Sequence, residues 1–299
     1  MIILGAGGRL GAALARQYAA DIQGRITPLS RKEADLTQPS QIASLIKKDR
    51  PNVVINCAAM TNVDACESER ERAEIINATT PGILARACTE VGARFIHVST
   101  DYVFSGETNR PYRETDQPDP VSWYGETKLR GEKAVAAAGP RHAIVRVAWV
   151  FGPDRDSFID KALQTALRGE PVKAVADKYS SPTYTLDVAE ALHPLFPPLA
   201  PGGVYHVCNQ GSCTWADWAG EAIKAAQAEG FPVQTSHVEH LKLADISQMV
   251  ARRPVYSAMS CQKIERLRGE PMRPWQAAVR DYLRLLRSEG RLVEGKTSG

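Results

Sequence analysis

The first fifteen residues, MIILGAGGRLGAALA, place Gly5, Gly8 and Gly11 at G-x-x-G-x-x-G spacing between an apolar run and a helical pattern. A strand that turns directly into a helix needs glycine for the tight turn. It also needs glycine where backbone approaches a ligand and where the helix packs against the strand. The free N–H groups at the start of such a helix attract phosphate. This context favours a pyrophosphate-binding turn of a dinucleotide site over an ordinary surface turn.

Apolar runs and helical patterns alternate along the first half of the chain. A sheet whose strands are joined by helices is parallel and has both faces covered, so its strands are continuously apolar. We therefore predict an α/β fold with a doubly wound parallel sheet of the Rossmann type. Its strands are expected at 1–4, 25–29, 52–59, 94–100 and 142–151, and its helices at 9–20, 39–49 and 71–92, the last interrupted at Pro81-Gly82.

Beyond residue 150 the strands become shorter and proline-rich connectors appear, as in FPPLAPGG. This change predicts a smaller C-terminal α/β lobe that binds substrate. We expect residues 1–150, together with about 184–210, to form the nucleotide-binding domain, and residues 151–183 and 211–299 to form the substrate lobe. The terminal segment EGKTSG is expected to fray, and the first predicted strand begins at Met1 with little lead-in.

The bulk composition excludes several classes of protein. Hydrophobic residues make up 43% and charged residues 24%, the balance of a soluble globular protein, and no long uncharged apolar run predicts a membrane span. The 37 basic and 34 acidic residues give a net charge of +3, too balanced for a nucleic-acid binder. The MIILGAGG start is not a signal peptide. A cytoplasmic protein that binds neither membrane nor nucleic acid is expected.

The cysteine and histidine spacings do not favour a metal site. The six cysteines include no C-x-x-C pair, and several lie in apolar runs, so buried reduced thiols are expected. His237 and His240 have no third ligand nearby in the sequence. We therefore predict no bound metal.

The residues after the second predicted strand bear on the choice of cofactor. An acidic residue there would bind the 2′-hydroxyl of an adenosine ribose. The sequence instead has Ser30 and Arg31, followed by Lys32. A hydroxyl and a guanidinium suit a 2′-phosphate, so we predict NADPH, with NADH still possible. Arg31 as a plain surface residue is the alternative.

A hydroxyl at a strand end and a Tyr-x-x-x-Lys pair predict the reaction centre. Thr100 ends the strand 94–100, and Tyr124 and Lys128 follow in VSWYGETKLRGE, one helical turn apart. Two ordinary residues of an amphipathic helix would show the same spacing. A ketone that receives hydride needs a proton, however, and a phenol beside an ammonium can supply it while a hydroxyl binds the same oxygen. Together with the glycine turn, these residues predict a ketone reductase.

The motifs GAGGRLG, INCAAMTNVDACESE, STDYVFSG, YGETKLRGE, VRVAWVFG and SSPTYTLDVAEAL occur in this order. They make the chain resemble the extended short-chain dehydrogenases and, within them, the dTDP-4-dehydrorhamnose reductase family. The resemblance runs nearly end to end. GVYHVCNQGSCTWADWA, ARRPVYSAMSCQKI and PWQAAVRDYL lie towards the C-terminus, largely in the predicted substrate lobe, and favour this family over the superfamily at large.

The resemblance implies reduction of the C4 ketone of dTDP-4-dehydro-6-deoxy-L-mannose to dTDP-L-rhamnose. It makes Thr100, Tyr124 and Lys128 the catalytic triad, with Tyr124 as proton donor and Lys128 also on the nicotinamide ribose. The remaining implied contacts are Gly8, Arg9 and Leu10 with the pyrophosphate, Asp35 and Leu36 with the adenine, Ala58, Ala59, Met60 and Thr61 along the cofactor cleft, and Asp101 and Trp149 with the sugar.

Some positions allow a second interpretation or depart from the family. Trp149 could be a core residue, and Asn77 could bend its helix with or without holding a water molecule. Met60 replaces the usual aromatic or histidine residue before T-x-V-D. Ala13 stands where some relatives have a glutamate that joins a metal at a dimer interface, so a monomer or weak homodimer is expected.

Three other functions remain as alternatives. A dehydratase would need an acidic pair after Thr100, whereas the chain has Asp101-Tyr102. A C4 epimerase would keep NAD bound and would be expected to carry an acid at Ser30. A non-catalytic NADP-binding subunit, of the type that partners methionine adenosyltransferase, would keep the nucleotide site, although the intact Tyr124 and Lys128 weigh against it.

Overall fold

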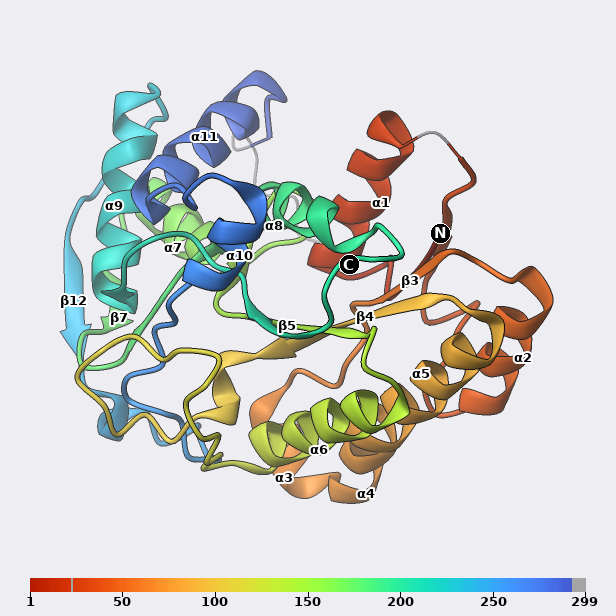
Figure 1. Cartoon of the computed structure of the whole chain (residues 1–299). Coiled ribbons are helices and arrows are strands. Elements are labelled where there is room, and N and C mark those ends of the chain that lie inside the picture. Colours follow the sequence, from red (N-terminus) through yellow and green to blue (C-terminus); the bar gives the residue numbers. More distant parts are fainter. Residues whose placement is uncertain (23, 292–299) are drawn as a thin grey trace.

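A computed structural model describes residues 1–22 and 24–291 and contains one large parallel sheet (Figure 1). Its strand order is β10-β5-β4-β3-β1-β2, and every neighbouring pair is parallel. The α/β doubly wound fold is therefore confirmed. The strands are β1 (Ile2–Leu4), β2 (Thr27–Leu29), β3 (Val53–Asn56), β4 (Arg94–Thr100), β5 (Ala143–Val147) and β10 (Gly203–His206).

Helices cover both faces of this sheet, which explains why its central strands are apolar on both sides. Helices α1 (Arg9–Asp21) and α8 (Thr185–Leu192) pack together on one face. Helices α2 (Pro39–Asp49), α5 (Thr80–Val91) and α6 (Trp123–Ala138) pack in a row on the other. Each face has its own buried apolar cluster.

The C-terminal part of the chain builds a second, smaller group of elements with a separate apolar core (Figure 1). Helix α9 (Trp215–Ala228) lies against α7 (Phe158–Leu167) and α11 (Trp275–Ser288). Three two-stranded sheets complete it, formed by β7 (Val172–Val175) with β12 (Val238–Leu241), β8 (Tyr179–Ser180) with β11 (Cys213–Thr214), and β6 (Val150–Phe151) with β9 (Thr183–Tyr184). The arginines at helical spacing on α11 include Arg280 and Arg284, which form ion pairs with Glu221 and Glu229 of α9.

Two predicted elements are interrupted in the structure. The strand expected at 142–151 splits into β5 and β6, because Trp149 has φ +39° and turns the chain between them. The helix expected at 71–92 is divided into α4 (Arg70–Glu74), a π-helical turn η1 (Ile75–Thr79) and α5. The predicted interruption at Pro81 is thus displaced by a few residues, because proline fits the first turn of a new helix.

The remaining helical elements are short: α3 (Val63–Ser68), α10 (Gln262–Arg268) and the 3₁₀ turns η2 (Asp101–Val103), η3 (His193–Leu195) and η4 (Leu243–Asp245). Among the residues described, no helix combines the length and apolar character needed to cross a membrane. The segment EGKTSG, for which fraying was expected, lies outside the described residues.

Candidate active site

The turn between β1 and α1 is built around close backbone contacts. Gly5 has φ +78°, and a Cβ there would lie 2.7 Å from the backbone nitrogen of Ala58. A Cβ on Gly11 would lie 2.2 Å from the carbonyl oxygen of Gly5. Gly8 is less crowded, with 3.2 Å to the same oxygen, and as the N-cap of α1 it offers no side chain to the helix N–H groups. This arrangement fits a pyrophosphate placed over Gly8 and the open end of α1.

Arg9 and Leu10 begin α1 with their side chains turned to the protein. The Arg9 guanidinium donates to the carbonyl oxygens of Val150 at 3.2 Å and Arg155 at 3.0 Å, and also to that of Asp156. Leu10 is buried in the core under the sheet. Both residues would therefore bind phosphate through backbone N–H groups.

The residues after β2 contain an acidic group that the sequence prediction did not take into account. The Glu33 carboxylate accepts hydrogen bonds from the backbone N–H of Ser30, at 2.9 Å, and from the Ser30 hydroxyl. These hydrogen bonds lower the pKa of Glu33. Arg31 lies 3.8 Å from the Asp35 carboxylate and is largely exposed. A 2′-phosphate bound to Ser30 and Arg31 would thus lie beside the negatively charged carboxylate of Glu33.

The loop after β3 is held from beneath by Asn77 of η1. The Asn77 amide accepts from the backbone N–H of Met60 at 2.9 Å and donates to its carbonyl oxygen at 3.0 Å. It also donates to the Thr127 hydroxyl of α6 at 3.3 Å. The π-helical turn accounts for the bend at Asn77, and its amide fixes the loop after β3. A water molecule held by Asn77 stays a prediction. The predicted cleft residues Ala58, Ala59, Met60 and Thr61 follow one another in this loop and are half-buried, except the exposed Thr61.

The two residues expected at the adenine lie just past β2, in the segment that leads to α2. Asp35 accepts from the backbone N–H of Thr37 at 2.9 Å. Leu36 is buried, and its carbonyl oxygen accepts from the Thr80 hydroxyl at 2.7 Å. Their contact with adenine stays a prediction.

Thr100 and Tyr124 meet where β4 ends. The Thr100 hydroxyl donates to Asp101 at 3.1 Å and accepts from the backbone N–H of Tyr102 at 3.2 Å. Burial raises the pKa of Tyr124, and its hydrogen bond with Thr100 opposes this rise. The phenol therefore stays protonated at neutral pH, as a proton donor requires.

Helix α6 is pressed tightly onto this strand end. A Cβ on Gly125 would lie 2.2 Å from the carbonyl oxygen of Tyr102, so only glycine allows this approach. Ser122 caps the helix by accepting from the Gly125 N–H at 3.3 Å. The close contact places Tyr124, in the first turn of α6, beside Thr100.

Lys128 lies one turn further along α6 and is 1% exposed. Its Nζ donates to the carbonyl oxygen of Val98 at 2.7 Å and lies 3.2 Å from Nε2 of His97. Burial lowers the pKa of Lys128 to about 8, while the charges of Glu132 and Cys57 oppose the shift. The structure thus brings Thr100, Tyr124 and Lys128 into one region at the carboxyl end of β4.

Asp101, expected to touch the sugar, is instead almost enclosed by protein. It is 2% exposed, and its second carboxylate oxygen accepts from the hydroxyls of Ser180 at 2.9 Å and Ser257 at 2.5 Å. The fully buried Lys178 faces it with a positive charge that partly offsets the rise in its pKa caused by burial. Asp101 therefore ties the catalytic strand end to two segments of the smaller lobe.

Trp149 lies between the large sheet and the smaller lobe. Its ring is stacked on Trp218, with centroids 5.6 Å apart, and Nζ of Lys178 lies 5.7 Å from its centroid. The side chain is half-buried, and its buried indole N–H has no hydrogen-bond partner among the described residues. An indole N–H without a partner suits a substrate oxygen, which agrees with the predicted sugar contact.

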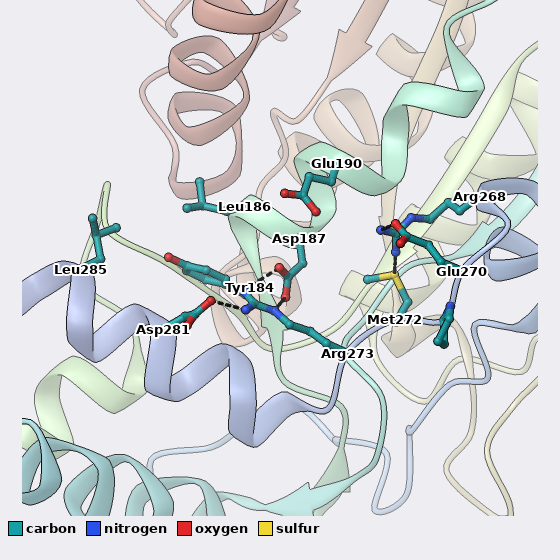
Figure 2. Close-up of a pocket in the computed structure, with 11 residues that line it drawn as sticks. Tyr184, Leu186, Asp187, Glu190, Arg268, Glu270, Met272, Arg273, Asp281 and Leu285 are labelled. Carbon is teal, nitrogen blue, oxygen red and sulfur yellow. Dashed lines mark hydrogen bonds and ion pairs between the residues drawn. The ribbon is translucent and has the colours of Figure 1, made fainter.

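A cavity of about 460 Å³ lies elsewhere, between α8, α11 and the segment after α10 (Figure 2). Its most prominent side chain is Arg273, which bridges Asp187, at 2.8 Å, and Asp281. Beside it, Arg268 pairs with Glu270 at 2.6 Å. The Arg273 pairs join α8 to α11, and none of the predicted site residues lines this cavity.

Residues 1–288 match the family model described as RmlD substrate binding domain. The chain belongs to this family. A dTDP-4-dehydrorhamnose reductase from Burkholderia thailandensis is 36% identical to it over 289 residues, covering 93% of this chain and 96% of the relative. The resemblance found in the sequence is therefore confirmed.

Solved structures agree with this membership of the RmlD family. A dTDP-4-dehydrorhamnose reductase from Clostridium acetobutylicum superposes with a TM-score of 0.87 at 33% identity, covering 96% of this chain and 99% of its own. One from Bacillus anthracis, in complex with NADP, gives a TM-score of 0.86 at 32% identity, covering 95% and 97%. The structural similarity to these reductases thus extends over nearly the whole length of this RmlD family member.

Sequence reasoning missed His97, Lys178, Ser180 and Ser257 in this RmlD family member. Ser180 and Ser257 lie within motifs that carried the resemblance, SSPTYTLDVAEAL and ARRPVYSAMSCQKI, but no spacing links either to Asp101. The contact of these two serines with Asp101 depends on how the smaller lobe packs against the sheet.

Proposed function

We propose that this protein is an NADPH-dependent oxidoreductase that reduces the C4 ketone of dTDP-4-dehydro-6-deoxy-L-mannose to dTDP-L-rhamnose. The observation that carries the proposal is the meeting of Thr100, Tyr124 and Lys128 at the end of β4, with the glycine turn at the end of β1, two strands away in the same sheet. Ligands of open α/β sheets bind beyond the carboxyl ends of the strands. The family relatives named above support the substrate.

Tyr124, Thr100 and Lys128 each have a separate role in the reduction. A bound dihydronicotinamide would supply the hydride. Tyr124 gives its phenolic proton to the ketone oxygen, and Thr100 polarises that oxygen once its hydroxyl turns from Asp101. The ammonium of Lys128 stabilises the phenolate that remains.

The other expectations complete the proposal. We propose that residues 1–150 with about 184–210 bind NADPH and that the rest forms the substrate lobe. At the boundary with that lobe, Trp149 offers a flat apolar face and its indole N–H to the sugar. A cytoplasmic monomer or weak homodimer is the proposed working form.

The decisive experiment follows NADPH oxidation at its absorbance band with the 4-ketosugar nucleotide as substrate. Turnover that depends on both compounds supports the reductase. Tight NADPH binding without turnover would instead favour the regulatory-subunit alternative. Interconversion of a sugar nucleotide without net cofactor oxidation would favour an epimerase.

Glu33 provides a test of cofactor choice. Glu33→Gln removes a negative charge beside Ser30, so we expect the ratio of the Kd for NADPH to that for NADH to fall by roughly threefold to fivefold. The reason is that the Glu33 carboxylate repels a 2′-phosphate but can accept a hydrogen bond from a 2′-hydroxyl. Calorimetric titration with each cofactor measures both constants without any turnover.

Glu170→Gln is the matched control, because Glu170 is also an exposed carboxylate with a lowered pKa, but it lies in the smaller lobe and is paired with Arg168. Its Kd ratio should match the wild type. An unchanged ratio in Glu33→Gln, or a shift towards NADH, would show that Glu33 does not face the 2′ position.

A further inference from the structure

A row of buried polar side chains runs behind the reaction centre, from β3 through β4 to α6. Asn56 and His97 are fully buried, and Lys128 is 1% exposed. Asn56 Nδ2 lies 3.3 Å from His97 Nδ1, and His97 Nε2 lies 3.2 Å from Lys128 Nζ. Because each contact is within hydrogen-bond distance, the donor and acceptor at each step can be worked out in turn.

The orientation of the Asn56 amide is set first. Its Oδ1 accepts from the backbone N–H of Ala58 at 3.1 Å, and a backbone N–H can only donate. The other end of the amide, the NH₂ group, must therefore face His97. The Nδ1 atom of His97 has to accept, so the single proton of the neutral ring is on Nε2. Burial and the charge of Lys128 keep the pKa of His97 low, which maintains the neutral ring.

This tautomer turns an N–H towards Lys128. An ammonium has three donors and no acceptor, so a charged Lys128 would meet the His97 N–H with another donor. A neutral amine has one lone pair and two N–H groups. The lone pair accepts from His97 Nε2, one N–H goes to the Val98 carbonyl oxygen at 2.7 Å, and the second remains for a ligand. The neutral form satisfies every contact that the structure shows.

We propose that His97 is a positioning residue for Lys128: Asn56 holds it as the Nε2–H tautomer, and this N–H, turned towards Nζ of Lys128, favours the neutral amine over the ammonium. The pair thereby sets the protonation state of the lysine from behind the site. For its kinetic consequence the inference rests on the proposed reductase function, whereas the tautomer itself can be measured without any reaction.

The other charged and titratable groups near Lys128 do not account for the effect of His97 on its protonation. Cys57 after β3 and Glu132 on α6 act on it by charge, and both oppose the fall in its pKa to about 8. Arg146 of β5 pairs with Glu132, η1 carries no titratable side chain, and Arg86 of α5 is exposed. Several carboxylates on elements packed against α6 are paired with cations: Asp64 with Arg253, Glu67 with Arg70, Glu69 with Arg72 and Glu74 with Arg130. Asp101 lies in the field of the Lys178 charge.

The predicted pH dependence follows from the lowered pKa of Lys128. Below about pH 8 the lysine is charged and stabilises the phenolate of Tyr124, and above it the amine is neutral and the rate falls. Removing the His97 donor should make the charged form more favourable. The alkaline limb of kcat/KM should then move to higher pH.

Two substitutions alter the hydrogen bonds between Asn56, His97 and Lys128 in different ways. His97→Asn keeps an oxygen that can accept from Asn56 but has no donor that reaches Lys128. Asn56→Asp replaces the amide NH₂ by a carboxylate oxygen, which accepts from Nδ1–H and moves the ring proton away from Nε2. We expect both variants to shift the alkaline limb upward by about one pH unit. His142→Gln, which removes a buried histidine just before β5, at the opposite end of the sheet, is the control and should leave the limb in place.

The direct readout is the ¹⁵N spectrum of the histidine rings, with the His97 signals identified by their loss in His97→Asn. A proton on Nε2 in the wild type and on Nδ1 in Asn56→Asp supports the inference. A wild-type ring protonated on Nδ1, or an alkaline limb unmoved in a folded His97→Asn, would overturn it. If neither variant folds, the wild-type spectrum decides, with the His97 ring signals assigned through its backbone resonances. Absence of turnover in the wild type would refute the proposed function and leave the tautomer result intact.

Discussion

Replacing Tyr124 by phenylalanine is expected to lower kcat for ketone reduction by about 10² or more. The substitution removes only the phenolic oxygen, the group placed to give a proton to the substrate beside Thr100. Burial raises the pKa of this phenol, so the wild type retains its proton across the neutral range. The Kd for NADPH should stay close to the wild-type value, because the glycine turn and Lys128 are unchanged. Stopped-flow measurement of NADPH oxidation, with a separate binding titration, checks both expectations.

Tyr18→Phe is the matched control for this experiment. Tyr18 is also a buried tyrosine, but its hydroxyl donates to the carbonyl oxygen of Ala189 on α8, on the opposite face of the sheet from α6. Losing that hydrogen bond should cost some stability and little turnover. Near-native kcat in Tyr124→Phe would show that the proton comes from elsewhere. An equal loss in both variants would point to general destabilisation.

Replacing Glu132 by glutamine is expected to lower the free energy of unfolding by about 3–5 kcal/mol. Glu132 of α6 and Arg146 of β5 form two hydrogen bonds, at 2.9 and 2.6 Å, and their side chains are 4% and 3% exposed. Without the carboxylate, the guanidinium remains buried beside His206 and the ring of Phe104, with no other ion-pair partner among the residues that the structure describes. Urea denaturation of the two proteins measures the difference.

The double variant Glu132→Leu with Arg146→Met should recover much of this loss, because it removes both charges together. Glu126→Gln, on the same helix, is the control. Its pair with Arg130 is exposed, so breaking it should change the free energy of unfolding by less than about 1 kcal/mol. A Glu132→Gln variant as stable as the wild type would mean that Arg146 finds another partner.

The architecture of the large sheet could be predicted because its signals are local. Each strand from β1 to β5 is a short apolar run, and helices α1 and α2 follow the expected patterns. The predicted strand at 142–151 was wrong at one point, because the left-handed backbone of Trp149 is imposed by packing between the lobes. Glycine turn, Thr100, Tyr124 and Lys128 could likewise be predicted, since each occurs in a motif that needs no distant partner.

The residues that surround these motifs could not be predicted in the same way. Lys178 and Ser257 reach Asp101 from 77 and 156 positions along the chain, and Glu33 lies beside Ser30 only because the chain bends back after β2. Burial and contact of this kind are products of tertiary structure. The sequence SRKEAD shows that Glu33 is close to Ser30 along the chain, but not that its carboxylate accepts from both donors of Ser30.

The contact between Gly125 and the Tyr102 carbonyl gives the site a further property. The position of the proton donor depends on a main-chain contact that a side chain at position 125 would prevent, together with the packing of the Tyr124 ring on Tyr102. Side chains outside these contacts can therefore change without moving Tyr124 away from Thr100. Such a centre can be inherited unchanged while the parts of the smaller lobe that do not contact Asp101 diverge to admit other ketones, whereas a substitution at the glycine would disturb it.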